Sequence, residues 1–224
     1  LIIEPLVQCA GQMAMHAPRY VKGAKQLCEQ YEVHLIADEI AVGCGRTGRF
    51  FACEHAGVWP DFLCLSKGIS GGYLPLSLVM TREAIYQSFY SDSLARGFLH
   101  SHSYTGNPLA CRAALATLEI FDEDNVLVQN RERAAQLNGA LASFAIHSQV
   151  KHFRQQGMIW AFDAQVDDPH LAATFSRRFF SCALKHELLV RPIGTSVYLM
   201  PPYVLSNADI NLLAERLQSV FHEV

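Results

Sequence analysis

Short apolar runs alternate with amphipathic stretches along the first half of the chain. The apolar runs predict strands over residues 1–7, 33–37, 62–65 and 76–81, and an amphipathic stretch predicts a helix over residues 19–31. Because these strands are apolar on both faces, we expect a parallel sheet covered by helices. The pattern therefore predicts an α/β fold for this half of the chain.

The pattern changes after residue 122. Asn107 precedes Pro108, which suits the first position of a helix running to about Phe121, and the polar cluster at residues 122–125 ends that helix. Further on, the pattern predicts helices over residues 127–144, 171–186 and 207–221, and strands over residues 150–155, 158–162 and 197–200. Ser206 is the expected N-cap of the last helix. This order predicts two domains, residues 1–122 and a smaller α+β domain at residues 123–224.

Composition and charge limit the partners that the chain can have. Its 224 residues are 50% hydrophobic and 17% charged, which is typical of a globular protein that needs no disulfide or metal to stabilise its core. The net charge of −3 lacks the basic excess that nucleic-acid binding requires. No apolar run approaches the ~20 residues of a membrane helix. We therefore expect small-molecule ligands, and neither nucleic acid, membrane nor metal as a partner.

The cysteines and the first residues bear on the chain's origin. Seven cysteines without a CxxC pair fit neither a disulfide framework nor a zinc ribbon, so we expect reduced cysteines and a cytoplasmic location. The chain opens with LIIEPLVQ, without Met, in what reads as a buried strand. We therefore expect a C-terminal fragment whose N-terminal part is missing.

Two charged residues follow consecutive expected strands. Asp38 ends the strand in HLIADEI, and Lys67 follows the strand in PDFLCLSKG. The carboxyl ends of strands are where open α/β sheets bind ligands. Pyridoxal phosphate needs this pair, because a lysine holds its aldehyde and an aspartate keeps its ring nitrogen protonated. Neither residue is specific alone, since a strand-end Asp is often a helix cap and a Lys beside Ser and Gly is usually a solvated loop charge.

Longer segments carry a resemblance to a known family. LIADEIAVGCGRTGRFFACEH, PDFLCLSKGISGGYLPLS and HSHSYTGNPLAC resemble the class III, fold-type I pyridoxal-phosphate aminotransferases, in order and over nearly the whole chain. IIEPLVQCAGQM, ACEHAG and RPIGTSVYLMPPYV are similar to the members that act in biotin synthesis. The resemblance implies that residues 1–122 are the C-terminal part of a cofactor-binding large domain with a mostly parallel sheet. It also implies a homodimer with its active site at the interface.

The resemblance assigns cofactor contacts to four positions. Asp38 matches the residue that pairs with the cofactor's ring nitrogen, and Lys67 matches the lysine that binds its aldehyde. Ser103 stands where the family usually has a Thr that hydrogen-bonds the cofactor phosphate across the dimer interface, and a Ser hydroxyl can make the same bond. His102, beside it, stands where some members have Pro.

Three further positions match substrate contacts. Arg191 in LLVRPIG matches the arginine that binds the substrate carboxylate, a task for which a planar, permanently charged fork is suited. Without the resemblance it would be an ordinary surface Arg before a Pro. Ser101 stands where the biotin-synthesis members often have a Gly that contacts the substrate. Arg46 in GCGRTGR matches an arginine near the active site that either contacts the substrate or supports its turn.

The alternating histidines at 100 and 102 could suggest a metal, but a polar turn before a helix is favoured because no third ligand lies nearby.

The implied reaction is ping-pong transamination, in which S-adenosylmethionine or lysine gives its amino group to 8-amino-7-oxononanoate to form 7,8-diaminononanoate. In this family the N-terminal part supplies the phosphate cup and ring-stacking aromatics, so the chain alone need not be active.

Two alternatives remain open. One is a class III aminotransferase for 4-aminobutyrate, ornithine or another ω-amino acid, with 2-oxoglutarate or pyruvate. The other is a noncatalytic, truncated protein that keeps the fold.

Overall fold

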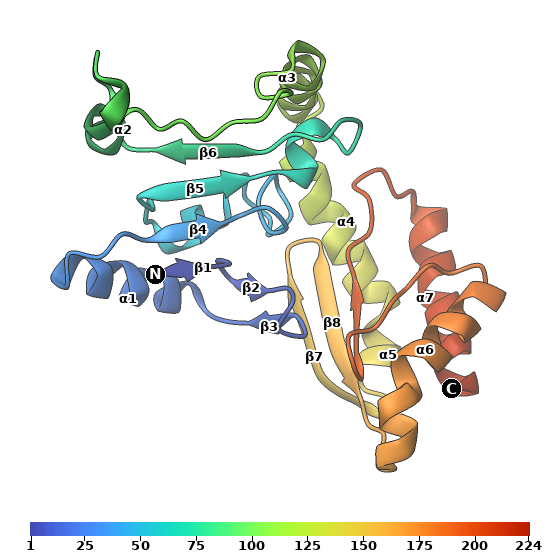
Figure 1. Cartoon of the computed structure of the whole chain (residues 1–224). Helices are drawn as coiled ribbons and strands as arrows, with labels where there is room; N and C mark the ends of the chain where they lie inside the picture. The colour runs from blue at the N-terminus through green and yellow to red at the C-terminus, as the bar shows by residue number, and fades with distance from the viewer. The chain divides into compact units, whose positions relative to one another are not determined.

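The computed structural model describes residues 1–224 and is shown in Figure 1. The chain forms two compact units. The first unit comprises Leu1–Leu6, His16–Gly45 and Arg49–Asn125, and the second comprises Val7–Met15, Arg46–Gly48 and Val126–Val224. None of the helices combines the length and the hydrophobicity of a membrane-spanning segment.

The first unit contains a four-stranded sheet in the order β1-β4-β5-β6. Its strands are β1 (Ile2–Ile3), β4 (Ile36–Asp38), β5 (Phe62–Leu65) and β6 (Leu78–Thr81). β1, β4 and β5 are parallel, as expected, whereas β6 runs antiparallel to β5. The sheet is therefore mostly parallel, as expected, and β6 is its antiparallel strand. A parallel strand needs a crossover connection, usually an α-helix, and no α-helix lies between β5 and β6.

The prediction that the strands are buried on both faces was wrong for β6. All four of its residues are exposed, and Val79 retains 66% of its accessible surface. In β4 and β5, by contrast, Ala37, Leu63 and Leu65 pack together in a buried cluster. The apolar sequence of β6 therefore does not reflect core packing within this unit.

Residues 1–7 form two short strands where the sequence predicted one. β1 ends at Ile3, and β2 (Val7–Gln8) pairs antiparallel with β3 (Ala14–Met15) in the second unit. Pro5 lacks the N–H that a continuing ladder would use, and Leu6 adopts a left-handed φ of 69°. These two residues end the first strand.

The two longer helices of the first unit both begin at a proline. α1 (Pro18–Gln30) has Pro at its start, and α3 (Pro108–Glu123) follows the N-cap Asn107, whose Oδ1 accepts the N–H of Leu109 at 3.0 Å. The sequence did not predict α2 (Glu83–Phe89), which buries no residue, or the short 3₁₀ helices η1 (Ala52–Ala56), η2 (Lys67–Ser70) and η3 (Leu94–Arg96).

The second unit is an α+β domain around an antiparallel sheet in the order β7-β8-β9. Its strands are β7 (Val150–Gln156), β8 (Ile159–Ala164) and β9 (Ser196–Leu199), and its helices are α4 (Val126–Ala140), α5 (Ala142–Ala145), α6 (Pro169–Lys185) and α7 (Asn207–Glu223). Trp160 and Phe162 of β8 are fully buried in one core with Phe179 of α6 and Leu217 of α7. Ser206 caps α7, as predicted, by accepting the N–H of Asp209 at 3.2 Å.

Candidate cofactor and substrate site

Asp38 and Lys67 lie at the same edge of the first unit's sheet. Asp38 is the last residue of β4, and the register places it opposite Cys64 of β5. Lys67 follows the end of β5 after a single residue, Ser66. Because β4 and β5 are parallel, both residues stand at the carboxyl ends of their strands, where ligands of α/β sheets bind.

The Asp38 carboxylate keeps most of its hydrogen-bonding capacity. It is half-buried, and Oδ1 accepts the N–H of Ile40 at 3.1 Å, which forms a local turn. No cationic side chain pairs with it, so its second oxygen can accept a bond from a ligand cation.

The neighbouring Glu39 has a structural role. It is fully buried, and its two oxygens accept the N–H groups of Ala52 and Cys53 at 2.6 and 2.8 Å. Burial raises the pKa of Glu39, and the two backbone hydrogen bonds oppose that rise. The two adjacent carboxyl groups therefore have different roles. Glu39 holds the start of the 3₁₀ helix η1, and Asp38 remains available to a ligand.

Lys67 is held in an uncommon backbone conformation while its side chain stays free. Its φ of 45° is left-handed, which costs a non-glycine residue on the order of 1–3 kcal/mol. The loop fixes this geometry: Ser66 Oγ donates to the Leu76 carbonyl at 2.7 Å, and a Cβ on Gly68 would lie 2.9 Å from Cys44 Cβ. The Lys67 amine is exposed and forms no hydrogen bond or ion pair. An unpaired primary amine held in this way is available for covalent chemistry.

Residues 101–103 form part of a polar turn before α3. The N–H of His102 donates to Thr105 Oγ1 at 3.1 Å, and His102 Nδ1 accepts the N–H of Tyr104 at 3.1 Å. The N–H of Thr105 also donates to the His102 carbonyl at 2.9 Å, so His102 lies in a polar turn before the helix, as the sequence predicts. Ser101 and Ser103 are exposed, and no hydrogen bond links them to Asp38 or Lys67.

α3 connects this turn to the lysine loop through buried contacts. Ala114 of α3 packs with Ile69 of η2 and with Cys44. The helix that follows the turn is therefore anchored on the 3₁₀ helix that Lys67 begins.

Arg46 lies in the second unit and is engaged in the protein's own contacts. Its Nη1 donates to the Pro201 carbonyl at 2.6 Å, and its guanidinium lies 4.4 Å from the centre of the Tyr203 ring. Its carbonyl accepts the N–H of Met158 at 2.8 Å. A Cβ on Gly157 would lie 2.3 Å from the Thr47 carbonyl carbon, so this turn requires glycine opposite it. Arg46 therefore supports its turn and the segment at residues 201–203.

Arg191 lines an open pocket of about 520 Å³ beside α6, here called the α6 pocket. Its polar and aromatic lining residues are Thr174, Ser176, Arg177, Phe180, Arg191 and Tyr198. Both arginines are exposed and have no ion-pair partner, and no acidic residue lines the pocket. The α6 pocket can therefore bind a carboxylate through one or two guanidinium groups.

Sequence reasoning missed Arg177. The signal available was helical spacing, because Ala173, Arg177 and Phe180 recur at intervals of three and four residues and so share one face of α6. Nothing in the sequence shows that this face meets the RPIG segment.

Solved structures with the same fold define the structural class. The chain superposes with a TM-score of 0.92 on adenosylmethionine-8-amino-7-oxononanoate aminotransferase from Methanocaldococcus jannaschii, at 31% identity, covering 100% of this chain and 53% of that one. It superposes with a TM-score of 0.88 on a PLP-bound amine transaminase from an uncultivated Pseudomonas species, at 32% identity, covering 100% of this chain and 52% of that one. The fold is that of the fold-type I PLP-dependent transferases, as expected.

The sequence places the chain within this class. The aminotransferase class-III family model matches residues 1–221, and the chain belongs to this family. Curated relatives named adenosylmethionine-8-amino-7-oxononanoate aminotransferase include those of Helicobacter pylori, 44% identical over 228 residues, and Synechococcus elongatus, 40% identical over 224 residues. Each match covers 100% of this chain and 52% of the relative. The chain thus spans about half the length of the curated relatives it matches.

Proposed function

We propose that this chain is the lysine-bearing part of a PLP-dependent aminotransferase that converts 8-amino-7-oxononanoate to 7,8-diaminononanoate in biotin synthesis. The observation that carries the proposal is the placement of Asp38 and Lys67, neither in an ion pair, at the ends of two neighbouring parallel strands. The names of relatives that match the whole chain support the choice of substrate.

The residues present fit the cofactor that the family implies. Pyridoxal 5'-phosphate, when bound, supplies an electron sink for the substrate carbon. Lys67 Nζ is free to bind its aldehyde, and the open oxygen of Asp38 is free to accept a hydrogen bond from its ring nitrogen. Asp38 would thereby keep that nitrogen protonated by its opposite charge. When Lys67 Nζ is not bound to the aldehyde, it would take the proton from the amine-bearing carbon of the donor and deliver it to the cofactor.

The partition of the chain follows from this assignment. We assign residues 1–122 to the C-terminal part of the cofactor-binding large domain and residues 123–224 to the small domain. The full protein is proposed to be a homodimer with its active site at the interface. There Ser103, assisted by His102, contacts the partner's cofactor phosphate. The exposure of residues 101–103, which have no partner on the lysine loop of their own unit, supports this role. None of the seven cysteines forms a disulfide, which supports a cytoplasmic location.

The substrate carboxylate is assigned to the α6 pocket. Arg191 offers a bidentate fork there, and Arg177 adds a second positive charge to the same pocket. Ser101 is proposed to contact the substrate near the cofactor. Arg46, which its own contacts already occupy, is proposed to act by positioning the segment at residues 201–203.

A donor and acceptor screen tests the proposal on the protein extended at its N-terminus to the length of the relatives. We expect 7,8-diaminononanoate to form from 8-amino-7-oxononanoate with S-adenosylmethionine or lysine as donor, and Lys67→Ala to abolish it. Turnover of 4-aminobutyrate or ornithine with 2-oxoglutarate or pyruvate, without reaction of the oxononanoate, would support the other class III assignment. No turnover with any pair would favour a noncatalytic protein.

A further inference from the structure

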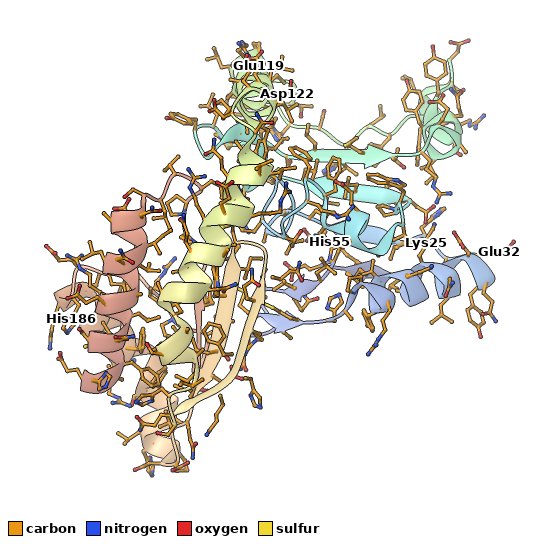
Figure 2. All side chains as sticks on the ribbon, turned by 180° about the vertical axis from the view of Figure 1, so that it is seen from behind. Lys25, Glu32, His55, Glu119, Asp122 and His186 are labelled. Atoms are coloured by element: carbon orange, nitrogen blue, oxygen red, sulfur yellow. The ribbon has the colours of Figure 1, made fainter.

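Three residues with metal-binding side chains meet where the last turn of α6 packs against the end of α7. Cys182 belongs to α6, His186 caps that helix one turn later, and Glu223 is the last residue of α7. His186 Nε2 and Glu223 Oε2 are 2.9 Å apart, and the three ligand atoms all lie within 4.8 Å of one another. His186, labelled in Figure 2, lies beside α7.

The burial of these residues forms a gradient from the core to the surface. Cys182 is 5% exposed, whereas the side chains of His186 and Glu223 are 31% and 49% exposed. The thiol therefore forms the floor of the cluster, and the imidazole and carboxylate form its solvent side. An ion can enter from solvent without any rearrangement of the core.

This cluster is separate from the α6 pocket. Cys182 is nine residues from Ala173, which at about 100° per residue places it on the opposite face of α6. Neither Asp38 nor Lys67 belongs to this unit. The proposed function leaves all three residues of the cluster without a role.

We propose that Cys182, His186 and Glu223 form a binding site for a divalent transition-metal ion of the Zn²⁺ type. A sulfur, an imidazole nitrogen and a carboxylate oxygen are the three ligand types that Zn²⁺ takes in proteins, and three protein ligands leave the fourth position to water. The ion would link the end of α6 to the end of α7. Binding requires the thiolate, so the thiol proton passes to solvent.

The geometry is close to that of a tetrahedral site. Metal–ligand distances of about 2.0–2.3 Å place ligand atoms roughly 3.4–3.6 Å apart in a tetrahedron. The distance of 2.9 Å between His186 Nε2 and Glu223 Oε2 must therefore increase by roughly half an ångström. A pair of ligand atoms at the 4.8 Å limit must approach by about one ångström. Side-chain rotation at the two surface residues can supply these changes.

Besides the hydrogen bonds that Glu223 makes to Cys182 and His186 within the cluster, two contacts to neighbouring groups compete with metal binding. The ammonium group of Lys185 lies 3.6 Å from Glu223 Oε1, the oxygen that does not contact His186. The thiol of Cys182 lies 3.9 Å from the Val220 carbonyl. The lysine pair is exposed and of small energy, and the sulfur contact is long, so an ion can replace both.

Titration of the metal-free chain with Co²⁺ tests the proposal, because thiolate-to-cobalt absorption reports sulfur ligation directly. We expect a saturable thiolate band that Zn²⁺ displaces, and an upward shift of Tm with Zn²⁺. Cys182→Ser should abolish the band, and His186→Gln and Glu223→Gln should weaken binding at least about 10-fold, the smallest effect expected even for residues that only support a ligand. The matched control is Cys111→Ser at an exposed cysteine, which should leave the titration unchanged.

Absence of a thiolate band in the folded chain would overturn the proposal, as would a band that survives Cys182→Ser. If circular dichroism shows that Cys182→Ser does not fold, the variants His186→Gln and Glu223→Gln test the site instead. Unchanged Co²⁺ affinity in both His186→Gln and Glu223→Gln would contradict the site, and a loss in both would support it.

Discussion

A buried ion pair beneath the first unit's sheet permits a quantitative prediction. The ammonium of Lys25, on α1, lies 3.3 Å from Asp61 Oδ2, and both side chains are 9% exposed. The same oxygen accepts the N–H of Leu35 at 2.8 Å, and Arg82 lies 3.2 Å from Oδ1. Asp61 therefore joins α1 and β6 to the segments that begin β4 and β5. Figure 2 labels Lys25 on α1.

Asp61→Asn removes the charge and keeps an oxygen for the Leu35 N–H. Breaking a buried pair by removing one partner costs about 3–5 kcal/mol, because the other charge stays buried. Glu29 still lies 3.6 Å from the Lys25 ammonium, so we expect the lower end, about 3 kcal/mol less free energy of unfolding at pH 7. Urea denaturation followed by circular dichroism measures it.

The pH dependence gives a second test of the same pair. Burial alone would raise the pKa of Asp61, but the Leu35 hydrogen bond and the charges of Lys25 and Arg82 lower it overall. The ionised carboxylate thus adds stability above the unfolded-state pKa of about 3.9, and this stability is lost as the pH falls through the lower folded-state pKa. The difference between wild type and Asp61→Asn should shrink over that range. The matched control, Lys25→Met with Asp61→Asn, keeps an oxygen for the Leu35 N–H and leaves no buried ammonium, so it should cost less than Asp61→Asn alone. A loss below about 0.5 kcal/mol for Asp61→Asn, the size of an ordinary surface effect, would refute the reasoning.

Three further predictions concern the turn and the proposed site. Gly157→Ala should destabilise the second unit by more than about 2 kcal/mol in thermal unfolding, because its Cβ would meet the Thr47 backbone. Gly139→Ala in α4 has open space around its Cβ, so in the same assay it should stabilise the unit by about 0.5–1 kcal/mol. In the extended protein, Arg191→Gln should raise KM for the oxononanoate at least about 10-fold through the lost carboxylate pair, and an unchanged KM would remove Arg191 from the site. Ser103→Ala should weaken cofactor affinity about 5- to 10-fold by the loss of one hydrogen bond, and Ser103→Thr should retain it, as equilibrium dialysis would show.

Local signals in the sequence predicted most of the elements. Asn107 with Pro108, and Ser206 at the last helix, marked helix starts that the structure confirms, because capping depends on residues next to one another in the chain. β6 was predicted as a strand, which the structure confirms, but its burial was predicted wrongly because an apolar sequence shows hydrophobicity and not which surface will cover it. The break after Ile3 was missed because Leu6 adopts a conformation that leucine seldom takes.

The candidate site was predictable only where it depends on strand order. Placing Asp38 and Lys67 at strand ends required only the strand pattern, and parallel pairing of β4 and β5 then brings those ends to one edge. Arg177 and Arg191 meet in the α6 pocket through the packing of a helix on a loop, which no local pattern encodes. The same holds for Glu223, which lies 37 residues beyond His186.

The central claim is that Lys67 binds the cofactor, and borohydride reduction after incubation with pyridoxal phosphate tests it most directly. Peptide mapping by mass spectrometry should find the reduced adduct on Lys67 in the extended protein. Lys67→Ala should remove it, whereas Lys22→Ala, at another exposed lysine, should not. An adduct spread over surface lysines, or one that persists in Lys67→Ala, would contradict the account.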